Sequence, residues 1–252
     1  MELLVLGNCS PSPRAGGACS GYLVKCGDKK VLLDCGSGSV SKLKKFYSIL
    51  DLDCIVLTHH HDDHTSDVYP IMDEFYVHKM FGGKNAEPLP IYVPVEPSAD
   101  FEKISSKYKG FFKIIQLDHT TEIKLGNMNI SFATTNHPIP CYATRIEANG
   151  KIFVYTSDTA YSKSIEEFCH NADLLLCEAG LPSFLGRPDD PSHIQTYQIA
   201  VMAENAGAKK VLLTHMWPDF DPYEVYLNEV VKSLTRPGTT VQIAEEESIY
   251  NI

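Results

Sequence analysis

Short apolar runs separated by Gly, Pro, Asn and Asp predict that β-strands dominate the first third of the chain. The runs ELLVLG, GYLVKC and KKVLLDCG each have the length of a strand and end at turn-forming residues. The GDKK segment between the second and third runs predicts a hairpin turn. Apolar residues at helical spacing, from Val40 to Leu50, then predict a helix over residues 39–50.

The rest of the chain alternates strand and helix patterns. After a buried strand over residues 52–59, the segment SDVYPIMDEFYV predicts a helix that Pro70 starts or interrupts. The Asn149-Gly150 pair between two apolar runs is a strong hairpin signal. Further strands are predicted over residues 90–94, 112–118, 121–126, 128–137, 173–180, 209–215 and 239–246, and further helices over 98–110, 162–172, 196–208 and 222–234. With no repeat or linker in the sequence, we predict one α/β domain, residues 1–252, with packed sheets and helices outside.

Composition and charge narrow the classes of protein that fit. A hydrophobic share of 44% and a charged share of 21% are ordinary for a globular protein. No apolar run approaches the roughly 20 residues that span a bilayer, and the N-terminal MELLVLGNCSPSP lacks the pattern of a secretion signal. The formal net charge of −10 disfavours broad attraction to nucleic acid or anionic membrane. A bound cation can still hold an anionic substrate locally.

The eight cysteines indicate a reducing compartment. None forms a C-x-x-C pair, and several lie inside apolar strand patterns. We therefore expect reduced, buried thiols and a cytoplasmic protein that does not contact membranes. The sequence leaves open whether the chain is a monomer or a homodimer.

Candidate metal ligands follow the ends of predicted strands. Five apolar runs end in an imidazole or a carboxylate: CIVLT in His59, ISFATTN in His137, IFVYTS in Asp158, LLLC in Glu178 and VLLT in His215. An α/β scaffold commonly collects site residues in this way, because rigid strands fix their geometry. We expect these side chains to meet at one edge of the fold.

The segment LTHHHDDHTSD, residues 57–67, contains the densest group of candidates. His59 and His61 are two apart, so in an extended segment both imidazoles point the same way and can hold one metal. Asp63 and His64 are adjacent and diverge toward a second point. Later strand ends can complete both sites, through His137, His215 and a bridging Asp158. Such ligands suit zinc, manganese or iron, and two ions about 3.5–4 Å apart can share a hydroxide and clamp a phosphoryl or acyl oxygen.

These motifs resemble those of the metallo-β-lactamase superfamily. THHHDDH fits its H-x-H-x-D-H signature, and TTNHP, YTSDT and LLTHMWP are similar to its later motifs in the expected order. LGNCSPSP, GYLV and VLLDCGSG also look like its opening strands, so the resemblance runs from about Met1 to Pro218. It implies a four-layer αβ/βα sandwich with a two-metal site at the edge of two central sheets.

The resemblance also implies which residues bind metal. Two ligand sets share Asp158: His59, His61 and His137 for one ion, and Asp63, His64 and His215 for the other. Asp63 is further expected to orient the attacking hydroxide. Because residue 158 is an acid, where many true β-lactamases have a cysteine, antibiotic hydrolysis is disfavoured. We expect two divalent ions, Zn²⁺ first, with Mn²⁺ or iron as alternatives.

The segment after Asp158 resembles the branch that contains the tRNA 3′-processing endonuclease, tRNase Z, and related phosphodiesterases. Glu178, His193 and His215 match its glutamate, its extra histidine and its last metal histidine. The resemblance implies that His193 contacts phosphate or protonates the leaving oxygen. Two simpler interpretations stay open, in which Ser192-His193 caps the next helix and Glu178 caps a strand end.

Two departures separate this chain from the tRNA endonucleases. Only PIPCYATRIEANGKIFVYTS separates His137 from Asp158, which leaves room for a hairpin but not for a long basic arm, and the loop SPSPRAGGAC lacks their polar-basic pattern. We therefore predict a phosphodiesterase for a small-molecule or nucleotide substrate, without extended RNA binding, in which a metal-bridging hydroxide attacks phosphorus. The alternatives are a tRNA 3′-processing endonuclease, a thioesterase or lactonase, and a di-iron redox protein with the same seven ligands.

Other polar residues receive plainer interpretations. His60 is predicted to be a spacer that points away from its neighbours, and Asp62 a solvated or helix-capping acid. Asp34 either bonds a ligand imidazole or caps a turn at Gly36. Three histidines lack a motif and are predicted to lie at the surface or in the ordinary core: His78, His119 and His170.

Overall fold

The computed structural model describes residues 1–82, 87–187, 190–220 and 222–252, and its strands form two seven-stranded sheets. The first sheet has the order β14-β1-β2-β3-β4-β5-β6. Its strands are β1 (Glu2–Gly7), β2 (Gly21–Cys26), β3 (Lys29–Cys35), β4 (Cys54–Val56), β5 (Leu89–Pro94), β6 (Phe112–Leu117) and β14 (Ile249–Asn251).

The second sheet has the order β13-β12-β11-β10-β9-β8-β7. Its strands are β7 (Glu122–Leu125), β8 (Met128–Thr134), β9 (Tyr142–Ala148), β10 (Lys151–Tyr155), β11 (Leu174–Glu178), β12 (Lys210–Thr214) and β13 (Thr240–Ile243). Each sheet is mixed. In the first sheet, neighbouring strands are antiparallel from β14 through β1 and β2 to β3, and parallel from β3 through β4 and β5 to β6. In the second sheet, neighbouring strands are antiparallel from β7 through β8 and β9 to β10, and parallel from β10 through β11 and β12 to β13.

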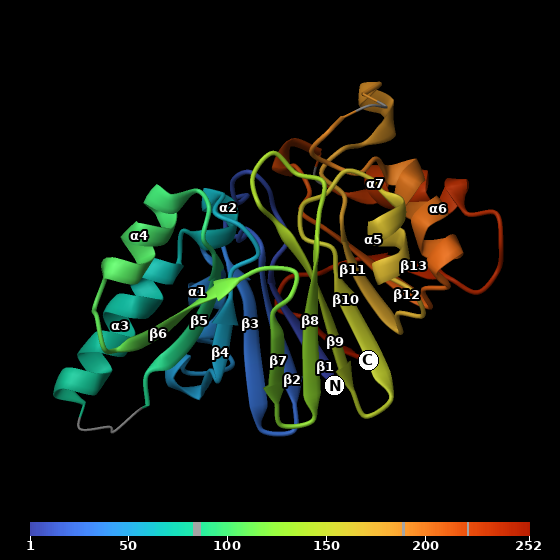
Figure 1. The fold of residues 1–252 in the computed structure, drawn as a ribbon. Coiled ribbons are helices and arrows are strands. Elements are labelled where there is room, and N and C mark those ends of the chain that lie inside the picture. Colours follow the sequence, from blue (N-terminus) through green and yellow to red (C-terminus); the bar gives the residue numbers. More distant parts are fainter. Residues whose placement is uncertain (83–86, 188–189, 221) are drawn as a thin grey trace.

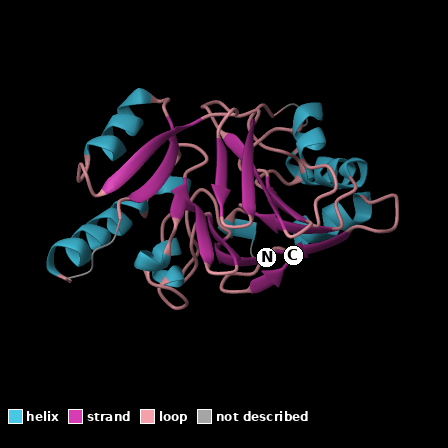
Figure 2. Cartoon of the chain, turned by 60° about the horizontal axis from the view of Figure 1, so that its bottom comes forward, coloured by secondary structure: helices cyan, strands magenta, loops and turns pink. Residues whose placement is uncertain are grey.

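Helices cover the outer face of each sheet, which gives four layers (Figures 1 and 2). On the first sheet these are α1 (Ser39–Leu43), α2 (Asp62–Thr65), α3 (Val68–Phe81) and α4 (Ser98–Ser106), and on the second α5 (Lys163–Phe168), α6 (Thr196–Ala206) and α7 (Glu224–Ser233). Three 3₁₀ turns are η1 (Ile49–Asp51), η2 (Ser183–Leu185) and η3 (Pro218–Phe220). The predicted αβ/βα sandwich is confirmed.

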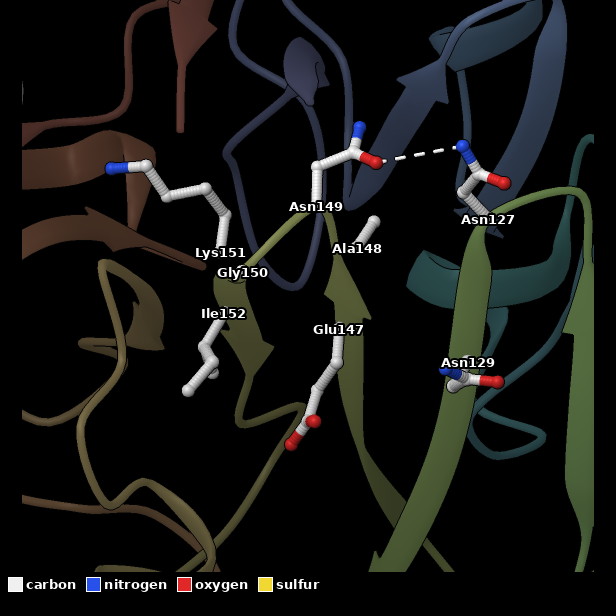
Figure 3. Close-up of a pocket in the computed structure, with 8 residues that line it drawn as sticks. All are labelled: Asn127, Asn129, Glu147, Ala148, Asn149, Gly150, Lys151 and Ile152. Atoms are coloured by element: carbon white, nitrogen blue, oxygen red, sulfur yellow. Dashed lines mark hydrogen bonds between the residues drawn. The ribbon is translucent and has the colours of Figure 1, made fainter.

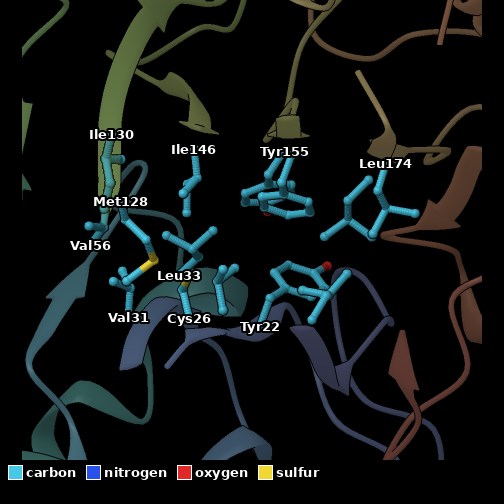
Figure 4. Packing of buried hydrophobic residues seen from close by; sticks show 14 of the residues in the cluster. Tyr22, Cys26, Val31, Leu33, Val56, Met128, Ile130, Ile146, Tyr155 and Leu174 are labelled. Carbon is cyan, nitrogen blue, oxygen red and sulfur yellow. The ribbon is translucent and has the colours of Figure 1, made fainter. Parts of the chain in front are cut away.

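The apolar runs of the central strands follow from burial on both faces. In β1, Leu3 and Val5 face the second sheet, whereas Leu4 and Leu6 face the helices of the first layer. A strand covered on both sides needs apolar residues at every position rather than at alternate ones. Figure 4 shows the two inner rows, with Tyr22 and Leu33 facing residues such as Ile146 and Tyr155.

One predicted helix is shorter than the sequence pattern suggests. The prediction of a single helix over residues 39–50 is wrong, because α1 ends at Leu43 and a separate turn, η1, begins at Ile49. Ser48 starts this second turn as its N-cap: its hydroxyl accepts from the Leu50 N–H, and Asp51 accepts from the Ser48 N–H. The pattern of apolar residues could not reveal this interruption. The edge strand β14 was likewise not predicted.

The turn predictions hold. A hairpin turn at Gly27 and Asp28 joins β2 to β3, and Asn149-Gly150 joins β9 to β10 with φ values of 54° and 73°. Both angles are positive, as a two-residue hairpin of this type requires. Pro70 is the third residue of α3, in the first turn, where its missing N–H costs no helical hydrogen bond. Among the described residues, no helix has the length and apolar character needed to cross a membrane.

Candidate metal centre

The polar residues predicted from strand ends meet at one edge of the two sheets. His59 follows β4, His137 follows β8, Asp158 follows β10 and His215 follows β12, while Glu178 is the last residue of β11. Asp63 and His64 lie in the short helix α2, whose N-cap is His61. Three groups of potential ligand atoms result, and within each group all atoms lie within 4.8 Å of one another: His59, His61, His137 and Asp158; Asp63, His64 and His215; and Asp158, His193 and His215.

The first group, called the His59 half, comprises His59, His61 and His137. The Nδ1 atom of His61 lies 3.1 Å from His59 Nε2 and 3.1 Å from His137 Nε2. A carboxylate closes the group, because Asp158 Oδ2 lies 3.6 Å from His59 Nε2 and 3.9 Å from His137 Nε2. Three imidazole nitrogens and one carboxylate oxygen converge here, a donor set that suits a transition-metal ion.

The second group, called the His64 half, comprises Asp63, His64 and His215. His215 Nε2 lies 3.2 Å from Asp63 Oδ2, and His64 Nε2 lies 3.7 Å from the same oxygen. The other oxygen of Asp158 faces this group, since Asp158 Oδ1 is 3.2 Å from His215 Nε2 and 3.3 Å from His64 Nε2. Asp158 therefore presents one oxygen to each half.

Unsatisfied polar atoms show that the residues present fit a cation. His64 Nε2, His215 Nε2 and Asp158 Oδ1 are buried and form no hydrogen bond within the described part of the chain. A buried polar atom without a partner is costly, so such atoms need an explanation. All three face the same point of the His64 half, and a cation there would satisfy all of them.

Hydrogen bonds on the far side of each ring orient the imidazoles. His64 Nδ1 lies 2.8 Å from Asp34 Oδ2, His137 Nδ1 lies 3.1 Å from the Ser192 carbonyl, and His59 Nδ1 lies 3.1 Å from Thr58 Oγ1. The first two partners are acceptors, so they hold the proton on Nδ1. The Nε2 lone pair is then left for the centre, which is the usual way in which a protein orients metal-binding histidines.

Asp34 is buried and accepts four hydrogen bonds. Besides His64, its partners are the Thr58 N–H at 2.8 Å, the Thr58 hydroxyl at 3.0 Å and the Tyr155 hydroxyl at 3.0 Å. The Gly36 N–H instead donates to the Ser20 carbonyl. Of the two interpretations of Asp34, the structure therefore supports the contact with an imidazole rather than a cap at Gly36.

The two halves differ in protonation. Burial lowers the pKa of His59, His61 and His137, which keeps these imidazoles neutral at pH 7. Burial also opposes charge on His64, but Asp158, Asp63 and Asp34 outweigh it and raise the pKa of His64 well above its usual range. The His64 half therefore carries excess negative charge, which a cation would neutralise.

His193 lies beside the centre and is held by Glu178. Its Nδ1 lies 3.0 and 3.1 Å from the two carboxylate oxygens, and its ring centroid is 5.5 Å from those of His137 and His215. Burial opposes its charge, yet Glu178 raises the pKa of His193 to about 10. The alternative role as a helix cap is wrong, because Gln195 is the N-cap of α6. Glu178 also accepts from the backbone N–H groups of Thr159 and Gly180.

Three residues at the same edge have a left-handed backbone conformation. Asp34, Ser157 and His215 have φ values of 55°, 52° and 59°, in the left-handed region that non-glycine residues seldom adopt. Such conformations cost of order 1–3 kcal/mol each and persist where the surrounding structure imposes them. Here they lie at the ends of β3, β10 and β12, where the chain turns to present side chains to the centre.

Several residues lie away from the centre, as the sequence predicted. His60 Nε2 contacts the Pro94 carbonyl at 2.8 Å, and Asp62 is exposed on the first turn of α2 without a capping hydrogen bond. The histidines without a motif, His78, His119 and His170, are not in the described clusters of potential ligands. Sequence reasoning missed Ser10, whose hydroxyl donates to Asp63 Oδ2 at 2.9 Å. No spacing signal identifies it, since Ser10 comes from the loop after β1.

The opposite end of the second sheet has a different character. The turns of the β7–β8 and β9–β10 hairpins border a shallow depression lined by Asn127, Asn129, Glu147, Ala148, Asn149, Gly150, Lys151 and Ile152 (Figure 3). These residues include no histidine or cysteine, and the depression offers a single carboxylate. The chemistry is thus concentrated at the carboxyl ends of the strands, which is where ligands bind in open α/β sheets.

An αβ/βα sandwich with this cluster at its edge defines a class of metal-dependent hydrolases. The family model described as a β-lactamase superfamily domain matches residues 29–216. The probable metallo-hydrolase YhfI of Bacillus subtilis is 36% identical over 226 residues, which cover 89% of this chain and 90% of YhfI. The ribonuclease Z of Mycolicibacterium gilvum is 27% identical over 252 residues, covering 88% and 86%.

Solved structures agree with the sequence comparisons. The crystal structure of YhfI from B. subtilis superimposes with a TM-score of 0.89 at 32% identity, covering 99% of both chains. The short form of human tRNase Z shares the fold, with a TM-score of 0.76 at 20% identity over 100% of this chain and 99% of that one. The chain belongs to the metallo-β-lactamase superfamily, and it is a metal-dependent hydrolase of that family.

Proposed function

We propose that this protein is a phosphodiesterase that works with two divalent metal ions. One ion is held by His59, His61 and His137, the other by Asp63, His64 and His215, and Asp158 contributes one oxygen to each. The geometry that supports this assignment is the convergence of ligand atoms in two adjacent groups. Zinc is the ion that we expect first, with manganese or iron as alternatives.

When bound, two such ions supply Lewis acidity and a water activated at neutral pH. The chain's own residues orient the attacking water and the metal-binding imidazoles, and they protonate the leaving group. Asp63 Oδ2 accepts a hydrogen bond from the Ser10 hydroxyl, and the same oxygen faces His215. These contacts hold the Asp63 carboxylate in place as an acceptor that can orient the attacking water. Asp34 and the Ser192 carbonyl keep His64 and His137 in the tautomer with Nε2 toward the centre.

The observation that carries the proposal is the Glu178–His193 pair. Phosphodiester hydrolysis expels an alkoxide, a poor leaving group that benefits from a proton donor. His193 sits at the margin of the metal centre with Nδ1 on the Glu178 carboxylate, so the imidazole is held protonated and Nε2 is left to donate. Thioester or lactone hydrolysis with the same metals would not need this pair.

A compact substrate fits the surroundings of the site better than a long RNA. Only the hairpin of β9 and β10 lies between His137 and Asp158, and the formal net charge is −10. The similarity to ribonuclease Z, at 27% identity, nevertheless makes tRNA 3′-end cleavage the second candidate. The eight free, buried cysteines support the expected cytoplasmic location.

The proposal is tested by varying the leaving group in zinc-loaded protein. We compare bis-(p-nitrophenyl) phosphate, whose leaving group needs little protonation, with a dinucleotide, whose leaving group is an alkoxide. Replacing His193 with Gln should slow the dinucleotide reaction by roughly 10²–10⁴-fold and the nitrophenyl reaction much less, at unchanged zinc content. His170→Gln, at an exposed histidine, is the matched control and should leave both rates unchanged.

Three outcomes would contradict the proposal. Equal losses of rate on both substrates would show that His193 is not the proton donor. Hydrolysis of a thioester or lactone without any phosphodiester activity would contradict the assignment as a phosphodiesterase. Cleavage of a pre-tRNA much faster than of the dinucleotide would favour the second candidate.

A further inference from the structure

Three aromatic side chains gather where two loops leave the edge that bears the metal centre. Trp217 and Phe220 follow β12, and Phe184 lies on η2, in the segment between Glu178 and His193. The rings of Trp217 and Phe220 are nearly parallel, at 13° with centroids 5.8 Å apart, and Phe184 meets Phe220 edge-on at 5.3 Å. We call these three residues the aromatic patch.

The aromatic patch is exposed but held from behind. Trp217 is 39% exposed and Phe184 is 52% exposed, an unfavourable state for large apolar rings. Behind them, the ring of the fully buried Tyr226 lies 6.1 Å from that of Phe220, and its hydroxyl accepts from the Trp217 N–H at 3.2 Å. The patch is therefore a fixed surface whose outer faces are open.

The connecting chain keeps the patch close to the metal centre. Trp217 follows His215 by two residues, so the Cα atoms of these two residues are at most about 7 Å apart. Met216, between them, is anchored by its N–H to the Asn8 carbonyl at 2.9 Å and by its carbonyl to the Ser10 N–H at 3.0 Å. In Figure 1 the loop after β11 rises from the same edge of the sheets.

We propose that the aromatic patch binds the nucleobase of a nucleotide substrate. This inference rests on the proposed function and specifies its substrate class. A ligand with a phosphodiester at the metal centre and a flat, uncharged group attached to it matches both features. A base offers a planar face that stacks on an aromatic side chain, as in single-stranded nucleic-acid binding. Stacking needs no positive charge, so it is compatible with an acidic protein.

Binding to zinc-loaded protein tests the inference without turnover. Adenosine 5′-monophosphate and ribose 5-phosphate differ only in the base, so the ratio of their dissociation constants measures base recognition. Isothermal titration calorimetry should show tighter binding of the nucleotide, and Trp217→Ala should reduce the ratio by about tenfold. Trp217→Phe should retain most of the preference. Phe81→Ala, which removes a 78% exposed ring on α3, is the control and should not change the ratio.

A second measurement needs no variant. Trp217 is the single tryptophan of the chain, so its fluorescence reports on the patch directly. The nucleotide should quench this fluorescence at saturation, whereas ribose 5-phosphate should not.

Equal affinities for the two ligands, or an unchanged ratio in Trp217→Ala, would overturn the inference. The test is separable from the proposed reaction. Phosphodiester hydrolysis without a preference for a base would support the proposed reaction and contradict base binding by the aromatic patch. Base-dependent binding without phosphodiester hydrolysis would support base binding by the patch and contradict the proposed reaction.

Discussion

The His59 half and the His64 half of the metal centre each combine three side chains with one oxygen of Asp158, but they differ in charge. The His59 half has three imidazoles that burial keeps neutral. The His64 half adds the carboxylate of Asp63, and Asp34 stands behind His64. The His59 half would therefore hold a cation mainly through neutral imidazole lone pairs, and the His64 half mainly through an excess of negative charge.

The largest effect is expected from removing the residue that the halves share. Asp158→Ala withdraws one oxygen from each half, so both metals should bind weakly and turnover should fall by roughly 10²–10³-fold or more. Elemental analysis of the purified variant, next to the rate, checks this. Retention of two tightly bound ions would show that the halves do not depend on a common carboxylate.

A smaller effect should separate the two halves. Asp34 contacts His64 and no imidazole of the His59 half among the described contacts. Asp34→Asn should therefore weaken metal binding in the His64 half by about 10–100-fold and leave the other half loaded. Competition with a chelator, followed as ions bound per chain, gives the two affinities. Equal weakening of both ions would mean that Asp34 supports the whole edge.

The pH dependence of metal uptake should sharpen the comparison with the smallest change per step, about tenfold for each pH unit. In metal-free protein, the raised pKa of His64 means that a proton must leave Nε2 before this nitrogen can bind an ion. Affinity of the His64 half should thus fall by about tenfold per unit as the pH drops below that pKa. The pKa values of His59, His61 and His137 are lowered, so uptake by the His59 half should stay constant down to a lower pH.

Calorimetric titration of zinc into metal-free protein at pH 6, 7 and 8 distinguishes the two classes of site. Repeating it in buffers of different ionisation enthalpy counts the protons released. Identical pH dependence for both ions would contradict the assigned charges.

Much of the fold was predictable because its strands are covered on both sides. Continuous apolar runs such as LLVL in β1 and LLLC in β11 produce a strong signal, and the Asn149-Gly150 turn fixes a hairpin locally. The interruption after α1 was not predictable, because it depends on the side chains of Ser48 and Asp51 rather than on apolar spacing. The edge strand β14 was missed because three residues that pair with β1 carry no pattern of their own.

The sequence by itself determined which residue types stand at the strand ends and in what order, and hence the family and its metal-dependent hydrolase chemistry. Only the tertiary structure decided which atoms face one another: that Asp158 presents one oxygen to each half, that Asp34 and Ser10 support His64 and Asp63, and that Trp217 and Phe184 join one patch. The physical reason is distance along the chain. Strand ends are specified by local apolar runs, whereas contacts between residues 10 and 63, or 184 and 220, exist only after the sheets have packed.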